Sequence, residues 1–389
     1  MFRIRTLNHI SQRGLERFDP KRFVVGSEVG DPDAILLRSF RMHDMPLPET
    51  LKAVGRAGAG VNNIPVAALS ARGIPVFNAP GANANAVKEL VVAGLLLAAR
   101  NLRGAWEFAE RLEGSDAEIH AAVEAGKKAY AGFELPGRTL GVVGLGAIGH
   151  MVANIGLALG MKVIGFDPEL TVEGAWQLSA DVRKAGSVAE LLRQVDFVSL
   201  HVPLIEATRN MIDAQGIALM KEDATILNFA REGIVDEEAV VAALNAGRLH
   251  AYLCDFPSNR LKGHPKVVAL PHLGASTREA EENCAVMVAD ELRDFLEHGN
   301  VRHAVNFPDV TAAREGVCRL AVANANVPNM VGQISTAMAR AGLNIHNLVN
   351  KSRGDLAYTL VDLDSALPDD VYAHIARIPG VLSVRRIGT

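Results

Sequence analysis

Two histidines in the segment CDFPSNRLKGHPKVVALPHLGAST, residues 254–277, could move a proton. His264 precedes a proline in a polar stretch, whereas His272 follows the strand-like run KVVALP. A histidine titrates near neutral pH, so it can take a hydroxyl proton while the neighbouring carbon gives up a hydride. Arg231 follows a second such run, ATILNFA, and its planar fork of donors suits a carboxylate. Together the residues predict oxidation chemistry on a 2-hydroxy acid.

The placement of these side chains matters more than their types. Taken alone, Arg231 is as readily a surface arginine and His272 a structural histidine. In an open parallel sheet, however, ligands lie beyond the carboxyl ends of the strands, and both residues follow such an end. We therefore expect both to face a ligand, and we interpret His264 as part of a loop.

A dinucleotide site is indicated by GVVGLGAIG, where Gly144, Gly146 and Gly149 have the G-x-G-x-x-G spacing. The spacing alone is weak in a chain with 35 glycines, and a turn that serves packing only is the alternative. Here it follows one strand pattern, opens a helix pattern and precedes a strand pattern that ends at Asp167. The glycines let the backbone approach a pyrophosphate at the helix N-terminus. Asp167 would bind ribose hydroxyls and repel a 2′-phosphate, so we expect NAD.

Alternating strand and helix patterns must position these residues. The first hundred residues and the stretch from Thr139 each predict a parallel sheet with crossover helices, the second with six strands. From about residue 311 the order becomes strand, helix, strand, strand, helix, strand. We expect an α/β fold: two Rossmann-like doubly wound parallel-sheet domains and a C-terminal ferredoxin-like βαββαβ domain. The expected domains are residues 1–98 with 285–310, then 99–284 and 311–389.

The composition excludes several classes of protein. The 389 residues carry a formal charge of −4, which gives no reason to expect a nucleic-acid partner. The run Leu90–Ala99 is too short to span a membrane, and the N-terminus lacks an apolar signal region. Cys254, Cys284 and Cys318 have neither the count of a disulfide framework nor the spacing of a metal site. We expect buried thiols, no metal and a cytoplasmic location.

The chain resembles the D-isomer-specific 2-hydroxyacid dehydrogenases over nearly its whole length. The resemblance rests on GRAGAGVNNIP, NAPGANANAVKEL, GLGAIG, NFAREGIVDEEAV, PHLGASTREAEENCA and AVNFPDV. It implies that Arg231 binds the substrate carboxylate and keto oxygen, that His272 is the general acid/base, and that the Ala59 and Gly60 N–H groups hold the carboxylate. It also implies a set of NAD contacts at Gly144, Gly146, Ala147, Ile148, Gly149, Asp167, Phe229, Ala230, Arg231, His272, Gly274 and either Asp255 or Cys254.

One departure from the family concerns the partner of the histidine. Family members usually read D-V-F-x-x-E before it, and that glutamate hydrogen-bonds the imidazole. Aligned on Phe256 this chain has Asn259 there, and aligned on Asp255 it has Arg260. Asn259 could orient the ring through its amide oxygen, but a neutral partner stabilises an imidazolium less than a carboxylate does. We include Asn259 as a candidate in place of the glutamate.

The resemblance also implies a substrate, and the residues offer candidates for its phosphate. The implied reaction is NAD-dependent oxidation of 3-phosphoglycerate in serine synthesis, and Arg38, Arg41 and Arg56 could bind the phosphate. By the resemblance, Arg38 matches a phosphate-binding arginine of some family members, whereas Arg41 and Arg56 could each instead be a solvated surface charge. The alternatives are another D-2-hydroxy acid, such as 2-hydroxyglutarate, and an NAD-sensing regulatory protein without activity.

The C-terminal pattern resembles the ACT domain, a regulatory module that binds amino acids between paired copies. Asn324, Asn326 and Asn344 fall where related dehydrogenases bind serine. The resemblance therefore implies L-serine as an effector and a homo-oligomer of at least two chains. The alternative is a dimerisation sheet whose asparagines serve turns.

Overall fold

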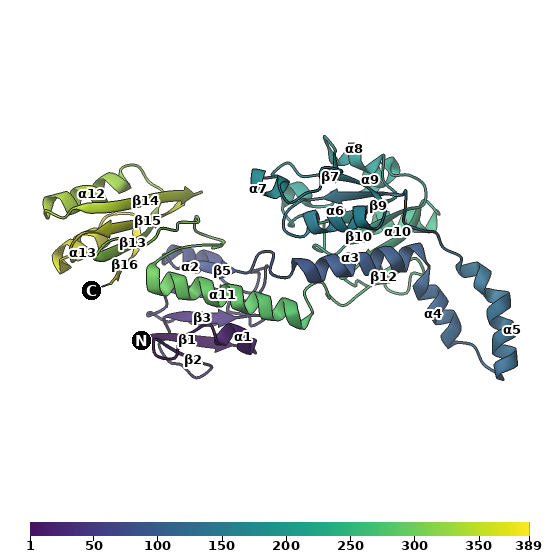
Figure 1. The fold of residues 1–389 in the computed structure, drawn as a ribbon, viewed down its shortest axis with the longest axis horizontal. Helices are drawn as coiled ribbons and strands as arrows, with labels where there is room; N and C mark the ends of the chain where they lie inside the picture. The colour runs from purple at the N-terminus through teal and green to yellow at the C-terminus, as the bar shows by residue number, and fades with distance from the viewer. Residues whose placement is uncertain (389) are drawn as a thin grey trace. The chain divides into compact units, whose positions relative to one another are not determined.

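The computed structural model describes residues 1–388, so the expected C-terminal boundary at Thr389 lies outside the described residues. The chain forms two compact units, coloured by residue number in Figure 1. The first unit combines Met1–Asn83 with the chain from Arg278 onward, and the second is Ala84–Thr277. The first unit thus contains both ends of the described chain, and the second is one continuous segment.

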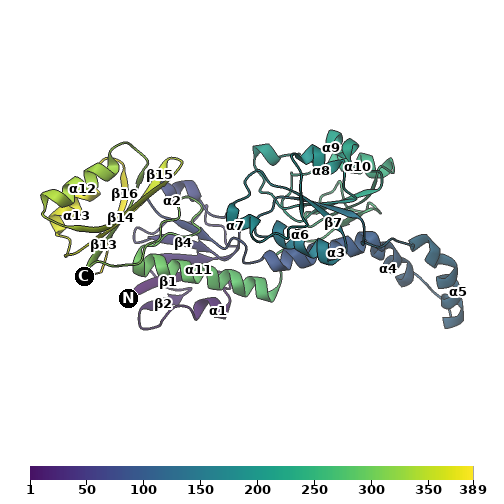
Figure 2. The same ribbon diagram turned by 45° about the horizontal axis from the view of Figure 1, so that its top comes forward.

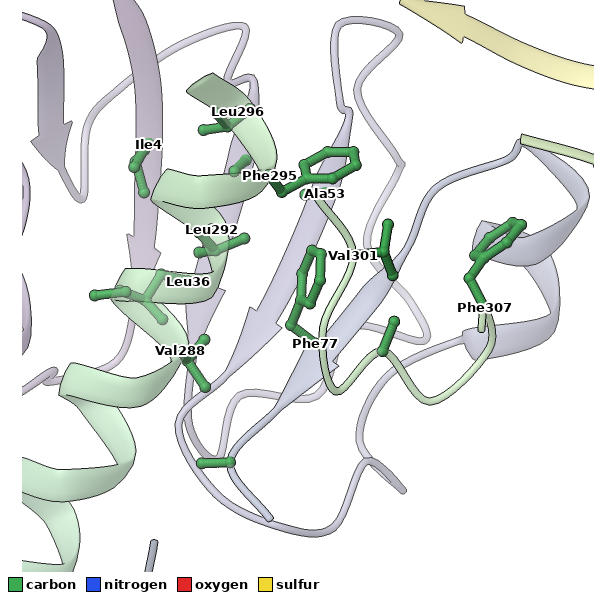
Figure 3. Packing of buried hydrophobic residues seen from close by; sticks show 14 of the residues in the cluster. Ile4, Leu36, Ala53, Phe77, Val288, Leu292, Phe295, Leu296, Val301 and Phe307 are labelled. Atoms are coloured by element: carbon green, nitrogen blue, oxygen red, sulfur yellow. The ribbon is translucent and has the colours of Figure 1, made fainter. Parts of the chain in front are cut away.

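The N-terminal half of the first unit is a five-stranded parallel sheet of order β2-β1-β3-β4-β5. Its strands are β1 Phe2–Leu7, β2 Phe23–Gly26, β3 Ala34–Leu37, β4 Ala53–Arg56 and β5 Val76–Asn78. Three helices accompany it: α1 Gln12–Leu15, α2 Val66–Ala71 and the long α11 Arg278–His298. Figure 3 shows how α11 buries Val288, Leu292 and Phe295 against this sheet.

The C-terminal part of the first unit is a four-stranded antiparallel sheet of order β14-β15-β13-β16. Its elements are β13 Cys318–Ala325, α12 Met330–Arg340, β14 Ile345–Arg353, β15 Leu356–Leu363, α13 Asp369–Ala376 and β16 Val381–Ile387. Figure 2 shows α12 and α13 with this sheet, and both helices contribute to its apolar core. The expected βαββαβ order is confirmed.

The second unit is a seven-stranded parallel sheet of order β12-β11-β10-β9-β6-β7-β8. Its strands are β6 Thr139–Val143, β7 Lys162–Phe166, β8 Arg183–Lys184, β9 Phe197–Leu200, β10 Ala224–Asn228, β11 Leu249–Cys254 and β12 Val267–Ala269. Counted from β6, this is the dinucleotide-binding order 3-2-1-4-5-6 with one strand added. Its helices are α3 Ala84–Ala99, α4 Leu102–Glu110, α5 Asp116–Gly126, α6 Gly149–Ala158, α7 Val172–Ala175, α8 Val188–Leu192, α9 Ala214–Leu219 and α10 Glu237–Asn245.

Local signals place several helix ends where the sequence indicates them. The Asp236 carboxylate accepts hydrogen bonds from the Glu238 and Ala239 N–H groups, so it caps α10. Gly247, with φ of 73°, follows the last residues of that helix. One long helical stretch after Asn83, by contrast, is interrupted: Asn101 has φ of 50°, and α3 and α4 are separate helices.

The division into units differs from the expected domain boundaries at three places: residues 311–388 form no separate unit but belong to the first, and both ends of the second unit are shifted. Helix α3, expected to belong to the first domain, buries Val87, Val91 and Leu95 in the same core cluster as Leu140 of the second unit. The second unit ends at Thr277, before α11 begins. The boundaries lie at helix ends because each helix stays with the sheet that covers its apolar face.

Candidate active site

The glycine-rich turn connects β6 to α6, and its three glycines have different surroundings. Gly144 has φ of 87°, which disfavours other residues. A Cβ on Gly149 would overlap the Gly144 carbonyl oxygen, so the third glycine brings helix and turn together. A Cβ on Gly146 would meet nothing within 4 Å. Gly146 and the next residue, Ala147, are exposed, whereas Ile148 is half-buried. The turn therefore has open space where a pyrophosphate would approach.

Asp167 follows the next strand, β7, and its carboxylate tightens the same turn. One oxygen accepts the Leu145 N–H at 2.7 Å, and the other accepts the Glu169 N–H at 2.9 Å. A carboxylate can accept about four hydrogen bonds, so both oxygens retain acceptor capacity. Asp167 is therefore held beside the glycine turn with capacity for ribose hydroxyls.

Arg231 lies two residues beyond the buried Phe229, after the end of β10. The Asn228 side chain shapes this turn, since its amide donates to the Arg231 carbonyl at 2.9 Å and its oxygen accepts the Ala230 N–H at 3.2 Å. The Arg231 guanidinium itself donates to the Ala230 carbonyl at 2.6 Å. Asn228 is 1% exposed, and it holds the backbone that presents the arginine.

His272 lies beyond the end of β12 and is bound to the neighbouring strand end through its backbone. Its N–H donates to the Asp255 carbonyl at 2.9 Å, and its φ of 45° is a left-handed conformation. The Phe256 ring meets the imidazole edge-on, with centroids 5.0 Å apart. His272 is exposed on the second unit. The aromatic contact and the turn thus orient the imidazole.

The Asp255 carboxylate, one residue beyond the end of β11, is buried. Its Oδ2 accepts the Gly274 N–H at 3.0 Å, while Oδ1 is buried and has no hydrogen-bond partner within residues 1–388. Burial raises the pKa of Asp255, and the Gly274 N–H, His272 and Arg231 act in the opposite direction. Arg231 and His272 thus both act electrostatically on one carboxylate. A buried oxygen without a donor can accept a hydrogen bond from a ligand.

Cys254 and Asp255, the two candidates for the contact with the NAD carboxamide, have different surroundings. Cys254 ends β11 inside the apolar core, where its thiol contacts the Phe256 carbonyl at 3.7 Å and burial raises its pKa to about 11. Asp255, one residue later, has the unpartnered oxygen. Asn259 is exposed in a turn, and within the described chain no hydrogen bond joins it to His272. Arg260 pairs with Glu238 at 3.6 Å.

The first unit carries the other predicted substrate residues at the carboxyl ends of its strands. After β4, the Ala59 carbonyl accepts the Asn78 amide at 2.5 Å, which fixes the glycine-rich loop. Neither the Ala59 N–H nor the Gly60 N–H donates a hydrogen bond to any described residue. Arg56 donates to the Arg38 carbonyl at 3.0 Å, so it supports the loop after β3. Two backbone donors are therefore left for an anion.

The phosphate candidates have different partners. Arg38 forms an ion pair with Glu281 of α11 at 2.6 Å, and both side chains are partly exposed. Arg41 is 74% exposed and lies 3.5 Å from Asp44. An anion that binds Arg38 must therefore compete with Glu281.

The three C-terminal asparagines lie at two ends of one sheet. Asn324 lies in β13 near its end and Asn326 follows that strand, whereas Asn344 precedes β14, whose first residue is level with the start of β13. The Asn326 amide donates to the Gly354 carbonyl, and the Asn344 amide donates to Asp364. The Asn324 Oδ1 is buried without a partner in the described chain. One copy of the sheet does not bring the three together.

Comparison with known proteins identifies the family. Residues 102–274 match the family described as D-isomer specific 2-hydroxyacid dehydrogenase, NAD binding domain. Over 352 residues the chain is 33% identical to D-3-phosphoglycerate dehydrogenase of Escherichia coli K12, covering 87% of this chain and 82% of the relative. The chain belongs to the D-isomer-specific 2-hydroxyacid dehydrogenase family. The family expected from the sequence motifs is thereby confirmed.

Other members of this family differ in length. D-3-phosphoglycerate dehydrogenase of Methanocaldococcus jannaschii is 35% identical over 345 residues, and the alignment covers 86% of this chain but 62% of the relative. NAD-bound 3-phosphoglycerate dehydrogenase of Entamoeba histolytica superposes with a TM-score of 0.61 at 25% identity, over 78% of this chain and 98% of that one. D-mandelate dehydrogenase of Rhodotorula graminis superposes with a TM-score of 0.66 at 24% identity, over 81% of this chain and 98% of that one. At this identity the likeness shows the fold alone.

Two further residues of this 2-hydroxyacid dehydrogenase, one buried and one half-buried, were not identified from the sequence. Asn228 resembles any strand-end residue in the sequence, and only its two hydrogen bonds reveal that it shapes the Arg231 turn. His201 contacts the Ser199 hydroxyl at 2.8 Å, and burial lowers its pKa to about 3. A Cβ on Gly144 would meet the His201 carbonyl at 2.5 Å, so this residue limits the glycine turn.

The cysteines, possible metal ligands and helices of residues 1–388 can be compared with the expectations from composition. All three cysteines are free and buried, as expected. No cluster of His, Cys, Asp and Glu suited to a metal ion occurs in residues 1–388. Nor does any described helix combine the length and apolar character that a bilayer crossing needs.

Proposed function

We propose that this chain oxidises D-3-phosphoglycerate to 3-phosphooxypyruvate with NAD, the first step of L-serine biosynthesis. The observation that carries the proposal is the set of strand ends at β10, β11 and β12. There Arg231 and His272 both act on the buried Asp255, which has one unpartnered oxygen. The relatives named D-3-phosphoglycerate dehydrogenase support the choice of substrate.

The cofactor residues fit NAD. The open space at Gly146 suits the pyrophosphate, Asp167 can accept from the ribose hydroxyls, and Asp255 Oδ1 can accept from the carboxamide. We assign the carboxamide contact to Asp255 rather than Cys254, whose thiol is enclosed in the apolar core. When bound, NAD supplies the hydride acceptor.

The chain's own residues account for the remaining chemistry. Arg231 binds the substrate carboxylate and polarises the oxygen on C2. As the hydrogen on C2 leaves with its electron pair, the hydroxyl proton passes to His272, and a C=O bond forms. The Phe256 contact limits the rotation of the imidazole, a task that we assigned to Asn259 from the sequence. Asn259 stays a weaker candidate.

A panel of substrates tests this function. We expect NADH production, followed at 340 nm, with D-3-phosphoglycerate and not with L-isomers, and we expect NAD to be preferred over NADP. His272→Gln should abolish turnover while NAD binding, measured by fluorescence, is retained, because only proton transfer is removed. Activity with unphosphorylated D-2-hydroxy acids alone would replace the proposed substrate. Binding of NAD without turnover would favour a regulatory protein.

One observation favours the alternative substrate class. Arg38, the best candidate for the phosphate, is already paired with Glu281. An unphosphorylated substrate, such as 2-hydroxyglutarate, would leave this pair intact. The substrate panel separates the two possibilities directly.

We also propose that the C-terminal sheet is an ACT domain that binds L-serine between two copies of the chain. The separation of Asn344 from Asn324 and Asn326 along one sheet supports a site shared by two copies. The exposed Trp106 and Leu102 on α4, a helix without buried residues, support assembly of at least two chains. We expect millimolar L-serine to lower the initial rate and Asn344→Ala to remove that effect; an unchanged rate would contradict it.

A further inference from the structure

A cavity of about 590 Å³ lies within the first unit, away from every residue assigned above. It opens where β16, the outer strand of the C-terminal sheet, meets the N-terminal sheet and the end of α11. Its wall contains five cationic side chains and one carboxylate: Arg22, Lys52, Arg314, Arg385, Arg386 and Glu297. These side chains come from segments far apart in the sequence, so only folding brings them together.

Local ion pairs neutralise only part of this charge. Three of the cations have a carboxylate partner: Arg22 with Glu297 at 2.8 Å, Lys52 with Asp33 at 2.6 Å, and Arg386 with Asp369. Within the described residues Arg314 and Arg385 form no ion pair with a carboxylate, although Asp33, the partner of Lys52, also acts electrostatically on Arg385. The group therefore has an excess of two positive charges, and clustered like charges repel unless an anion joins them.

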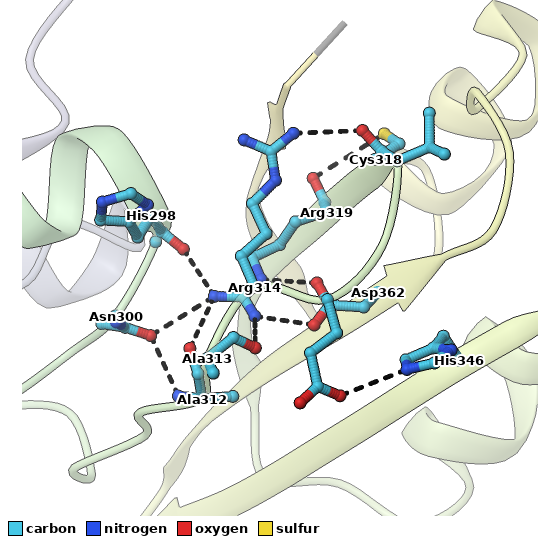
Figure 4. Close-up of polar contacts among 12 residues, drawn as sticks. His298, Asn300, Ala312, Ala313, Arg314, Cys318, Arg319, His346 and Asp362 are labelled. Carbon is cyan, nitrogen blue, oxygen red and sulfur yellow. Dashed lines mark hydrogen bonds and ion pairs between the residues drawn. The ribbon is translucent and has the colours of Figure 1, made fainter.

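The two cations without a carboxylate are held in place by carbonyl groups. Arg385 donates to the Phe295 and Leu296 carbonyls at 3.1 and 3.0 Å, and its guanidinium lies 4.2 Å from the Phe295 ring centroid. Arg314 donates to the Val317 carbonyl at 3.1 Å (Figure 4). A guanidinium has five N–H donors, so both retain donors for a ligand while their positions are restrained.

The rest of the cavity wall is apolar or aromatic. Phe2, Leu296 and Tyr372 line this part of the wall. The Tyr372 hydroxyl donates a hydrogen bond to the Val384 carbonyl at 2.8 Å, so its proton is already engaged. The volume lies in the range of pockets that hold small organic ligands. The cavity thus offers cations at its rim and a surface for the carbon skeleton of a ligand.

We propose that this cavity binds a small multivalent organic anion, a phosphate ester or a polycarboxylate. Its anionic groups pair with Arg314, Arg22 and the neighbouring cations, while its carbon skeleton lies against Phe2 and Tyr372. Such a ligand would bridge β16 to the loops that precede β2 and β4. Occupancy therefore strengthens the attachment of the C-terminal sheet to the N-terminal sheet.

Calorimetric titration of the full chain with pyrophosphate, and separately with citrate, tests the proposal at low ionic strength. Saturating NAD is included so that pyrophosphate does not occupy the glycine turn. We expect one site per chain, weakened about tenfold or more in Arg22→Gln and in Arg314→Gln, since each loses a charge-assisted contact. Binding of pyrophosphate alone identifies a phosphate ester, and binding of citrate alone identifies a polycarboxylate.

Arg13→Gln is the matched control, because Arg13 also pairs with a glutamate of α11, Glu282, at 3.0 Å but lies outside the cavity. Arg38→Ala tests whether the anion binds instead at the residues predicted to hold the substrate. Both variants should bind the anion as wild type does. The proposal is overturned if neither anion binds, if Arg22→Gln and Arg314→Gln bind normally, or if Arg13→Gln is weakened equally. NADH production does not enter the readout, so the proposed enzyme activity is tested independently.

Discussion

Buried carboxylates in this protein have two different environments. At Asp255, the Gly274 N–H, His272 and Arg231 oppose the effect of burial on the pKa, and one oxygen remains for a ligand. At Glu291 in α11, burial together with Asp309 and Asp290 raises the pKa to about 9, against the opposing effect of Arg302. Glu291 Oε1 lies 2.7 Å from His303 Nδ1, a contact in which the neutral acid can donate its proton. Residue type alone does not distinguish the two.

The raised pKa of Glu291 predicts a loss of stability with rising pH. An unfolded glutamate loses its proton near 4.5, whereas folded Glu291 keeps it to about 9, so the folded state binds more protons between these values. Stability should therefore fall as pH rises through this window. We expect Glu291→Gln to flatten the decline in the thermal midpoint between about pH 5 and pH 8. The exposed Glu279→Gln serves as control, and a parallel decline in all three proteins would contradict the assignment.

The β6–α6 turn combines folding and binding in one short element. Gly149 permits the close approach of α6 to the turn, whereas Gly146 faces open space. The same residue type therefore has a structural task at one position and a proposed ligand task three residues earlier. The spacing of the motif does not reveal this division, because it depends on which atoms surround each Cα in the folded chain.

Two alanine substitutions separate these tasks. Gly149→Ala should lower the thermal midpoint of the protein, since its Cβ would overlap the Gly144 carbonyl oxygen. Gly146→Ala should leave the midpoint close to that of wild type, because its Cβ meets no atom within 4 Å, but it should weaken NAD binding. Thermal melts and NAD titrations are compared for both. Unaltered NAD affinity in Gly146→Ala would show that the pyrophosphate lies elsewhere.

At the scale of the molecule, the C-terminal sheet is built into the first unit. Arg319, fully buried, forms an ion pair with Asp362 at 2.6 Å and donates to the carbonyls of His298, Ala312 and Ala313 (Figure 4). Residues of β13, β15 and β16 also share a core cluster with α11. The sheet is therefore anchored to the connecting chain and to the long helix by buried contacts.

Breaking the Arg319–Asp362 pair should destabilise this attachment. Asp362→Asn leaves a buried guanidinium without its counter-charge, and removal of one partner from a buried pair costs about 3–5 kcal/mol. We expect the thermal midpoint to fall clearly. Asp290→Asn, which removes a half-buried partner of Arg17 and Arg293, should lower the midpoint less, because solvent screens that pair. Equal effects of the two substitutions would show that the buried pair contributes no more than a surface pair.

Periodicity and turn residues in the sequence identified most elements. All six strands expected after Thr139 are present, because strands buried on both faces of a parallel sheet appear as uninterrupted apolar runs. No apolar pattern predicted β1, in which only Ile4 is buried, or the two-residue β8, whose side chains are exposed. Strands with few buried side chains lack the apolar pattern on which such a prediction depends.

The family, the dinucleotide turn and the strand ends that carry Arg231 and His272 were predictable from the residues alone. These features depend on local spacing, which is visible in the order of residues. The unpartnered oxygen of Asp255, the pairing of Arg38 with Glu281 and the five distant cations that line one cavity became visible in the folded chain. Those features depend on burial and on contacts between remote segments, and both arise only when the helices and sheets pack.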